Sequence, residues 1–77
     1  MTWINVKEST PITYKTGDFD GMNSDIVLIV DNNYNVSIGF LNEGFINGFK
    51  YKDWYDEKEY LLNEIPLYWM PLPSFPN

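Results

Sequence analysis

One uninterrupted apolar run near the middle of the chain constrains the fold more than any other feature. Residues 26–30 read Ile-Val-Leu-Ile-Val, four of them β-branched, and Asp25 and Asp31 bound the run. β-Branched side chains favour strands, and a short apolar run without polar alternation is typical of a strand buried on both faces. We therefore expect a central β-strand at residues 26–30.

The residues that follow this run also favour strands. Residues 31–35 are rich in asparagine, which tolerates positive φ, and predict a hairpin connection. Apolar and small residues then alternate over 36–41, as in a half-buried strand. Two turns could follow this strand equally well, a three-residue loop at 42–44 or a two-residue turn at Asn47-Gly48. The choice between them changes the pairing register of the next strand. We expect a third strand within 49–55.

The remaining segments predict irregular or edge structure. Residues 1–12 contain few apolar residues and end at Thr10-Pro11, which indicates a short edge segment, and 15–25 collect turn formers. Residues 56–62 could form one or two helical turns, because acids at a helix start are favoured by its dipole. The end, 66–76, holds four prolines and predicts an extended strap or edge strand.

Together these segments predict one domain spanning residues 1–77. Its fold class is all-β, a small antiparallel meander or partly open barrel-like sheet with at most one short helix. A chain of 77 residues buries only about 60% of its unfolded surface, so its core is thin and association with further copies would stabilise it. We expect a homo-oligomer.

Composition narrows the possible functions. The sequence contains no cysteine, histidine or arginine, which excludes Cys/His zinc sites, Ser-His-Asp and Cys-His catalysis and arginine clamps. Eleven acidic residues against five lysines leave a net charge of −6, which argues against nucleic acid or an anionic membrane as a direct partner. No apolar run approaches the ~20 residues of a membrane span, and no basic-then-apolar leader opens the chain. We expect a soluble protein that is not exported.

The two ends of the chain together resemble a known family. The most specific part is Trp69-Met70-Pro71-Leu72-Pro73, where most members carry histidine at the position of Tyr68. The other matching features are Trp3-Ile4-x-Val6, Pro11, the strand at 25–30 and Trp54. The chain thereby resembles the domain-of-unknown-function family 551 of short phage and prophage proteins. The resemblance implies a phage origin and an accessory, non-virion role in the cytoplasm of the infected bacterial host; it implies no particular activity.

Aromatic residues and two lysines near the third strand are the best candidates for a binding surface. Aromatics make up 18% of the chain, more than a small core can cover, and tyrosine and tryptophan are favoured at interfaces and pockets. Lys50 and Lys52 would project on one face of a strand, either as the wall of an anion pocket or as charges that block edge pairing. We assign Trp3 and Trp69 to the core. The candidate ligand- or partner-binding residues are Lys50, Tyr51, Lys52, Trp54 and Tyr55.

Two other arrangements are better explained without a special role. Acids and Asn23 alternate over 18–25, as calcium ligands do, but the glycine and the final acid of an EF-hand loop are out of place, so we expect a solvated acidic loop and no metal. The acids Asp53, Asp56, Glu57 and Glu59 could supply carboxylate pairs, yet a thin β domain seldom offers the cleft that catalysis needs. We expect neither a cofactor nor catalytic residues.

The sequence therefore favours a protein that acts by binding. It would counteract or redirect a host defence or another host process, either by masking the surface of a host protein or by sequestering a small nucleotide-like ligand. The negative charge favours a protein target. The alternatives are a structural module that only packs in an oligomer and, ranked last, a hydrolase that uses carboxylates and a metal.

Overall fold

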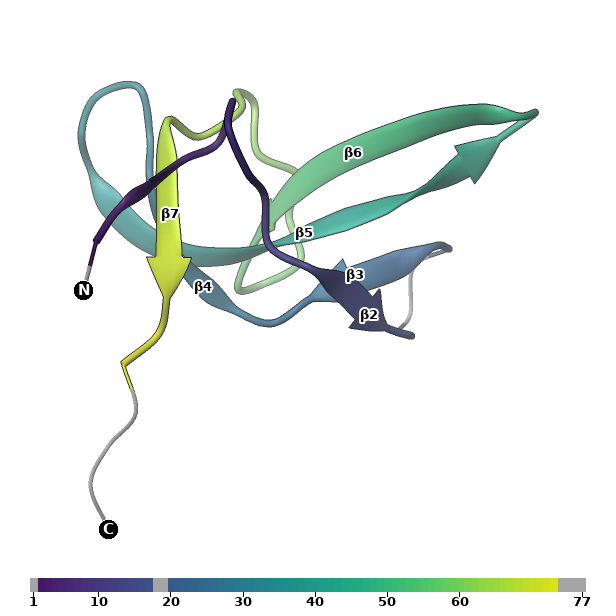
Figure 1. The fold of residues 1–77 in the computed structure, drawn as a ribbon, viewed down its shortest axis with the longest axis horizontal. Coiled ribbons are helices and arrows are strands. Elements are labelled where there is room, and N and C mark those ends of the chain that lie inside the picture. The colour runs from purple at the N-terminus through teal and green to yellow at the C-terminus, as the bar shows by residue number, and fades with distance from the viewer. Residues whose placement is uncertain (1, 18–19, 74–77) are drawn as a thin grey trace, which may run out of the picture.

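The chain folds into a curled antiparallel sheet that forms a half-barrel (Figure 1). The computed structural model describes residues 2–17 and 20–73, and within these ranges it contains no helix. The strands are β1 (Ile4–Asn5), β2 (Thr13–Lys15), β3 (Met22–Ser24), β4 (Val27–Val30), β5 (Val36–Ile46), β6 (Phe49–Asp56) and β7 (Tyr68–Pro71). The prediction of a small all-β protein is confirmed.

β4 lies inside the sheet, as its apolar sequence predicts. It pairs with β5 on one side and β7 on the other, and Ile29 lies opposite Ser37 and Trp69. A strand with two neighbours has its backbone groups paired, so its residues can be apolar throughout. The strand order is β1-β7-β4-β5-β3-β2, and β6 pairs with β5 outside this path. Two residues depart from the prediction of a strand buried on both faces: Ile26 precedes β4 and is exposed, and Leu28 is only partly buried.

β5 is long enough to serve three neighbours. Residues 36–39 pair with β4 and residues 42–43 with β3, while residues 39–46 pair with β6 along the opposite edge. At the gap between β3 and β4, the Ser24 hydroxyl accepts the buried N–H of Leu41 at 2.9 Å. An unpaired buried donor costs about 1–3 kcal/mol. Ser24 therefore completes the hydrogen bonding where the two neighbouring strands separate.

The turn after β5 falls at Asn47-Gly48, the second of the two sequence candidates. Both residues have left-handed backbones, with φ of 52° and 85°, as in the two-residue turns whose twist matches that of a hairpin. In the resulting register Leu41 lies opposite Trp54, and Glu43 lies opposite Lys52. This turn therefore decides which side chains of β5 and β6 share a face.

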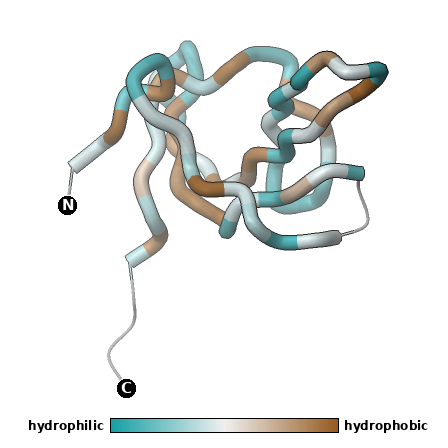
Figure 2. The backbone as a smooth tube through the Cα atoms, turned by 45° about the vertical axis from the view of Figure 1, so that its right-hand side comes forward, coloured by the Kyte–Doolittle hydropathy of each residue, from teal (hydrophilic) through white to brown (hydrophobic). Residues whose placement is uncertain are grey.

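Val30 and Phe40 are buried on one face of the sheet, which we call the outer face; the main hydrophobic cluster of the core lies on the opposite, inner face. Its buried residues are Val27, Ile29, Leu41, Trp54 and Trp69, with Ile4, Val6 and Leu62 packed against them. Figure 2 shows the hydrophobic stretches distributed around the curl and interrupted by hydrophilic ones. The Trp69 indole N–H donates to the carbonyl oxygen of Ser9 at 2.9 Å, which ties the N-terminal segment to the core. The assignment of Trp69 to the core is confirmed.

The assignment of Trp3 to the core is wrong. Its side chain is 39% exposed, because it precedes the two-residue edge strand β1, where the sheet ends. The C-terminal segment also differs from expectation, since β7 lies between β1 and β4 and is not an edge strand. Pro66 precedes β7 and Pro71 ends it, so the residues between them keep the N–H groups that a paired strand needs.

Two loops of the same geometry follow β4 and β6. In each, an aspartate (Asp31 or Asp56) accepts the N–H groups of the residues two and four positions later with Oδ1, at 2.8–2.9 Å. The third residue after each aspartate, Tyr34 or Glu59, has a left-handed backbone with φ of 62° or 69°. The hairpin predicted at 31–35 is therefore confirmed.

The helical turns considered for 56–62 do not form. The Asp56 carboxylate accepts the amides of the loop, and the left-handed Glu59 reverses the chain direction. Leu61 consequently forms an antiparallel bridge with Tyr55. Local hydrogen bonds from an aspartate side chain compete with helix formation in this way.

Candidate functional site

All five predicted binding residues lie on β6, and the pleat of the strand divides them between two faces. Lys50, Lys52 and Trp54 belong to the inner face, whereas Tyr51 and Tyr55 belong to the outer face. The two lysines do share a face, as predicted. They do not form a wall with Tyr51, because successive residues of a strand point to opposite sides of the sheet.

Both lysines face Glu43 on β5. The distances from Glu43 Oε2 to Nζ are 3.3 Å for Lys50 and 3.9 Å for Lys52, and the Thr13 hydroxyl donates to Oε1. Oε2 is buried and accepts no well-aligned hydrogen bond, so the ammonium groups balance its charge. The Thr13 hydrogen bond above all, helped by the two lysines, holds the pKa of Glu43 below its usual value of 4.5, against the opposing effect of partial burial. The three charged groups carry one net positive charge.

Tyr51 fixes the segment that enters β3. Its hydroxyl donates to the carbonyl oxygen of Asp20 at 2.9 Å. A Cβ on Gly44 would lie 2.9 Å from this hydroxyl and 3.1 Å from Gly21 Cα, so the close approach of the backbone segments at positions 21 and 44 requires glycine. Tyr51 is thus engaged in the fold of the outer face.

Tyr55 packs against Phe40 on the same face. The two rings stack with centroids 5.5 Å apart and an angle of 17° between their planes. Burial, followed by the negative charge of Asp53, raises the pKa of Tyr55 above its ordinary value of 10.0. Tyr55 is therefore part of the packing of the outer face.

Trp54 is a core residue. It is 5% exposed and lies opposite Leu41, which is fully buried. A ring covered to this extent cannot stack broadly on a ligand. Trp54 and Lys52 nevertheless both line a pocket beside β6.

The most exposed apolar group on β5 and β6 lies at the hairpin tip, which the sequence analysis did not single out. We define the hairpin tip as Phe45, Ile46 and Phe49, which are 71%, 63% and 79% exposed. Figure 1 shows the β5–β6 hairpin projecting away from β1 and β7. The sequence signal was present: three large apolar residues flank Asn47-Gly48, where turns usually carry polar ones.

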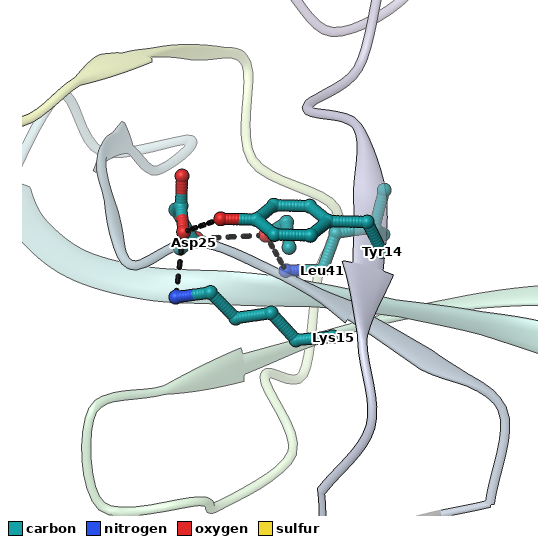
Figure 3. Close-up of polar contacts among 5 residues, drawn as sticks. Tyr14, Lys15, Asp25 and Leu41 are labelled. Atoms are coloured by element: carbon teal, nitrogen blue, oxygen red, sulfur yellow. Dashed lines mark hydrogen bonds and ion pairs between the residues drawn. The ribbon is translucent and has the colours of Figure 1, made fainter.

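A second polar cluster lies where β2 approaches the β3–β4 connection (Figure 3). Asp25 accepts a hydrogen bond from the Tyr14 hydroxyl at 2.6 Å and pairs with Lys15 at 2.6 Å. The bonds from Lys15 and Tyr14 lower the pKa of Asp25, and its carboxylate raises the pKa of both partners. All three groups are exposed, and exposed ion pairs contribute little to stability, so the cluster only links the β2 side chains to the β3–β4 connection.

Part of the acidic loop at 18–25 lies outside the described residues, at positions 18 and 19. Within 20–25, the Asp20 carbonyl oxygen accepts from Tyr51 and the Asp25 carboxylate is engaged by Tyr14 and Lys15. In the part of the chain that the structure describes, no three acidic residues are grouped closely enough to hold a metal ion.

Comparison with protein-family models, curated proteins and solved structures finds no match to this chain. Within residues 2–17 and 20–73 there is also no helix of the length and apolar character needed to cross a membrane.

Proposed function

We propose that this chain is an accessory, non-virion phage protein that acts by binding in the cytoplasm of the infected host. It masks the surface of a host protein and so counteracts or redirects a host defence or another host process. The C-terminal Trp69–Pro73 resemblance to family 551 supports the phage origin. A sequence without histidine, cysteine or arginine supports binding rather than catalysis.

The exposed hairpin tip is the observation that carries the proposal. Aromatic and large aliphatic side chains in an exposed group indicate a protein interaction site, because their exposure to water is unfavourable. Phe45 belongs to one face of the hairpin, and Ile46 and Phe49 pair on the other. Covering all three requires a partner with an apolar groove that encloses the end of the hairpin.

The backbone of the hairpin offers a second means of contact. Among the described residues, Phe49–Asp53 of β6 have no neighbouring strand on the edge that points away from β5. Residues 44–46 of β5 likewise have no neighbouring strand on the edge that points away from β6. Such edges can accept a strand from a partner. Lys50 and Lys52 lie along the β6 edge, where charged side chains disfavour indiscriminate pairing.

Charge indicates the kind of partner. A net charge of −6 attracts a basic surface over long range and accelerates encounter with it. The partner we propose therefore carries an apolar groove within a positively charged surface, as proteins that normally contact nucleic acid do.

Affinity purification from bacterial lysate tests this function. The baits are the wild type, a Phe45→Ser/Phe49→Ser variant, and a Leu61→Ser control that alters another exposed apolar residue, outside the hairpin tip. We expect one basic protein to be captured by the wild type and the control and lost with the hairpin variant. The captured protein, once purified, should bind with an affinity that falls as salt rises. Equal capture by all three baits would contradict the proposal.

Sequestration of a nucleotide-like ligand through Lys50, Tyr51, Lys52 and Trp54 has less support. Tyr51 and the lysines lie on opposite faces, and the Trp54 ring is covered. Stacking and phosphate contacts therefore cannot come from these four residues together.

A purely structural module is the second candidate, and a specific observation favours it. On the outer face, Met70, Leu28 and Ile38 form a row across β7, β4 and β5, and Tyr68, Val30 and Val36 form the next row. Of these six residues only Val30 is buried. A half-exposed apolar sheet face suits packing against another copy of the chain.

A further inference from the structure

A pocket of about 540 Å³ opens between the N-terminal segment, β6 and the residues that lead into β7. Its size is within the range of small-molecule sites, which are concave and mainly apolar. The apolar part of its lining comes from Val6, Trp54, Ile65, Pro66, Leu67 and Tyr68. Asn5, Lys7, Thr10, Asn32 and Lys52 supply the polar part.

Main-chain hydrogen bonds hold the walls of this pocket in place. The Val6 N–H donates to the Leu67 carbonyl oxygen at 3.1 Å, and the Leu67 N–H donates to that of Val30 at 2.8 Å. Asn5 accepts the Lys7 N–H with its side-chain oxygen at 2.9 Å, which shapes the turn that presents Lys7. Because the walls of the cavity are already fixed, a ligand that binds there does not incur the entropic cost of ordering them.

The charge of the lining sets this pocket apart in an acidic protein. Two of the five lysines line it, and none of the eleven acidic residues is among its described lining residues. In a second pocket Lys15 is paired with Asp25, and a third is lined by Asp31 and Glu64. The pocket beside β6 therefore has the charge to attract an anion.

Two acids that contact lining residues, Glu43 and Glu64, are already engaged by other groups. Glu43 is 3.9 Å from Lys52 Nζ but is closer to Lys50, at 3.3 Å, and also accepts from the Thr13 hydroxyl. Lys52 Nζ in turn lies 3.3 Å from the Thr10 hydroxyl oxygen at the pocket. Glu64 accepts a hydrogen bond from the Asn32 amide. Lys52 thus keeps charge available for a ligand, and Lys7 forms no ion pair with any described residue.

We infer that this pocket binds a small amphipathic anion, a molecule with a flat apolar body and one carboxylate or phosphate group. The body lies against Pro66, Leu67 and the edge of Trp54, and the anionic group lies between Lys7 and Lys52. This site is separate from the hairpin tip and does not depend on the function proposed above.

Binding of 2-naphthoate, measured by titration of amide NMR spectra at neutral pH, tests the inference. Its matched control is neutral 2-naphthamide, which has the same ring system without the charge. We expect naphthoate to bind with a Kd of about 0.1–1 mM, as befits so small a ligand, and naphthamide to bind at least about tenfold more weakly. The shifted amides should be those of residues 5–10, Ile65, Leu67 and Tyr68. Titration with 2-naphthyl phosphate shows which anionic group the lysines prefer.

Variants identify the residues responsible. Lys7→Gln/Lys52→Gln should weaken naphthoate binding about tenfold, while Lys58→Gln, which removes a lysine outside the pocket, should change it less than twofold. Phe45→Ser/Phe49→Ser should bind naphthoate like the wild type, which separates this site from the hairpin tip. Equal binding of naphthoate and naphthamide, shifts confined to other residues, or absence of binding at millimolar concentration would each overturn the inference, whether or not the lysine variant folds.

Discussion

At the scale of residues, polar side chains inside β5 hold separate parts of the sheet together. Asn42 is 2% exposed, and its amide donates to the Asp20 carbonyl oxygen at 3.0 Å and to Asn23 Oδ1 at 2.7 Å. Glu43, the next residue, pairs with lysines of β6 and accepts from Thr13 at the start of β2. A buried polar group must be paired, so each of these side chains requires its partners to be correctly placed.

Glu43 should make stability depend on pH. Its pKa is lowered in the folded protein, so the ionised carboxylate stabilises the fold above pH 4.5, and this contribution is lost as pH falls through the folded-state pKa. We expect Glu43→Gln to be less stable than the wild type near pH 7 and the difference to shrink below about pH 4.5. Urea unfolding at several pH values measures this. The control is Glu57→Gln on the exposed loop, whose stability should differ little from that of the wild type at any pH. If the difference in stability between the wild type and Glu43→Gln does not depend on pH, the ionised Glu43 carboxylate does not stabilise the fold.

At the scale of elements, the loops that begin with Asp31 and Asp56 show how one side chain can set a chain reversal. Each aspartate closes the same ring of hydrogen bonds, and each loop places a non-glycine residue in the left-handed region. That conformation is sterically unfavourable for any residue with a Cβ. The aspartate hydrogen bonds must therefore compensate for strain at Tyr34 and Glu59.

Glu59→Gly should accordingly stabilise the protein. Glycine relieves the strain at φ of 69°, and we expect the free energy of unfolding to rise by about 0.5–1 kcal/mol, net of the added flexibility of the unfolded chain. The matched control is Glu57→Gly in the same loop, where the backbone is not left-handed and the change should be neutral or destabilising. Thermal and urea unfolding measure both. A shift of both variants in the same direction would contradict the assignment of backbone strain to Glu59.

At the scale of the whole molecule, the chain exposes more surface than a monomer of its mass should. Its accessible surface is 5803 Å², about 900 Å² more than expected for a compact 9.1 kDa protein. One partner in a standard interface buries about 800 Å². An excess of this size is compatible with one such interface, which we propose at the two apolar rows of the outer face.

We predict a two-fold dimer at micromolar concentration, measured by sedimentation equilibrium. Val36→Glu, at an outer-face position that is 59% exposed, should give a folded monomer, because a charge directed into an apolar interface is left unpaired there. Leu61→Glu, at an equally exposed position outside these rows, should remain dimeric. A wild type that is monomeric and unfolds sharply at this concentration would exclude the dimer.

The fold class could be predicted from the sequence because its signals are local. The β-branched run at 26–30, the asparagine-rich connection after it and the alternation at 36–41 each favour a strand or a hairpin over a few residues. That Lys50 and Lys52 lie on the same face of the sheet follows from strand geometry alone. Even the turn at Asn47-Gly48 was one of two candidates.

Only the tertiary structure decided the candidate sites. The choice of Asn47-Gly48 over 42–44 extended β5 through Asn42 and Glu43 and set the register that buries Trp54 opposite Leu41. The pocket beside β6 unites residues from 5–10, 52–54 and 65–68, which no local pattern connects. The exposure of Phe45 and Phe49 likewise depends on where the neighbouring strands end. Local propensity specifies strands, whereas the burial of a side chain is a property of what packs around it, and that is determined by contacts between residues distant in the sequence.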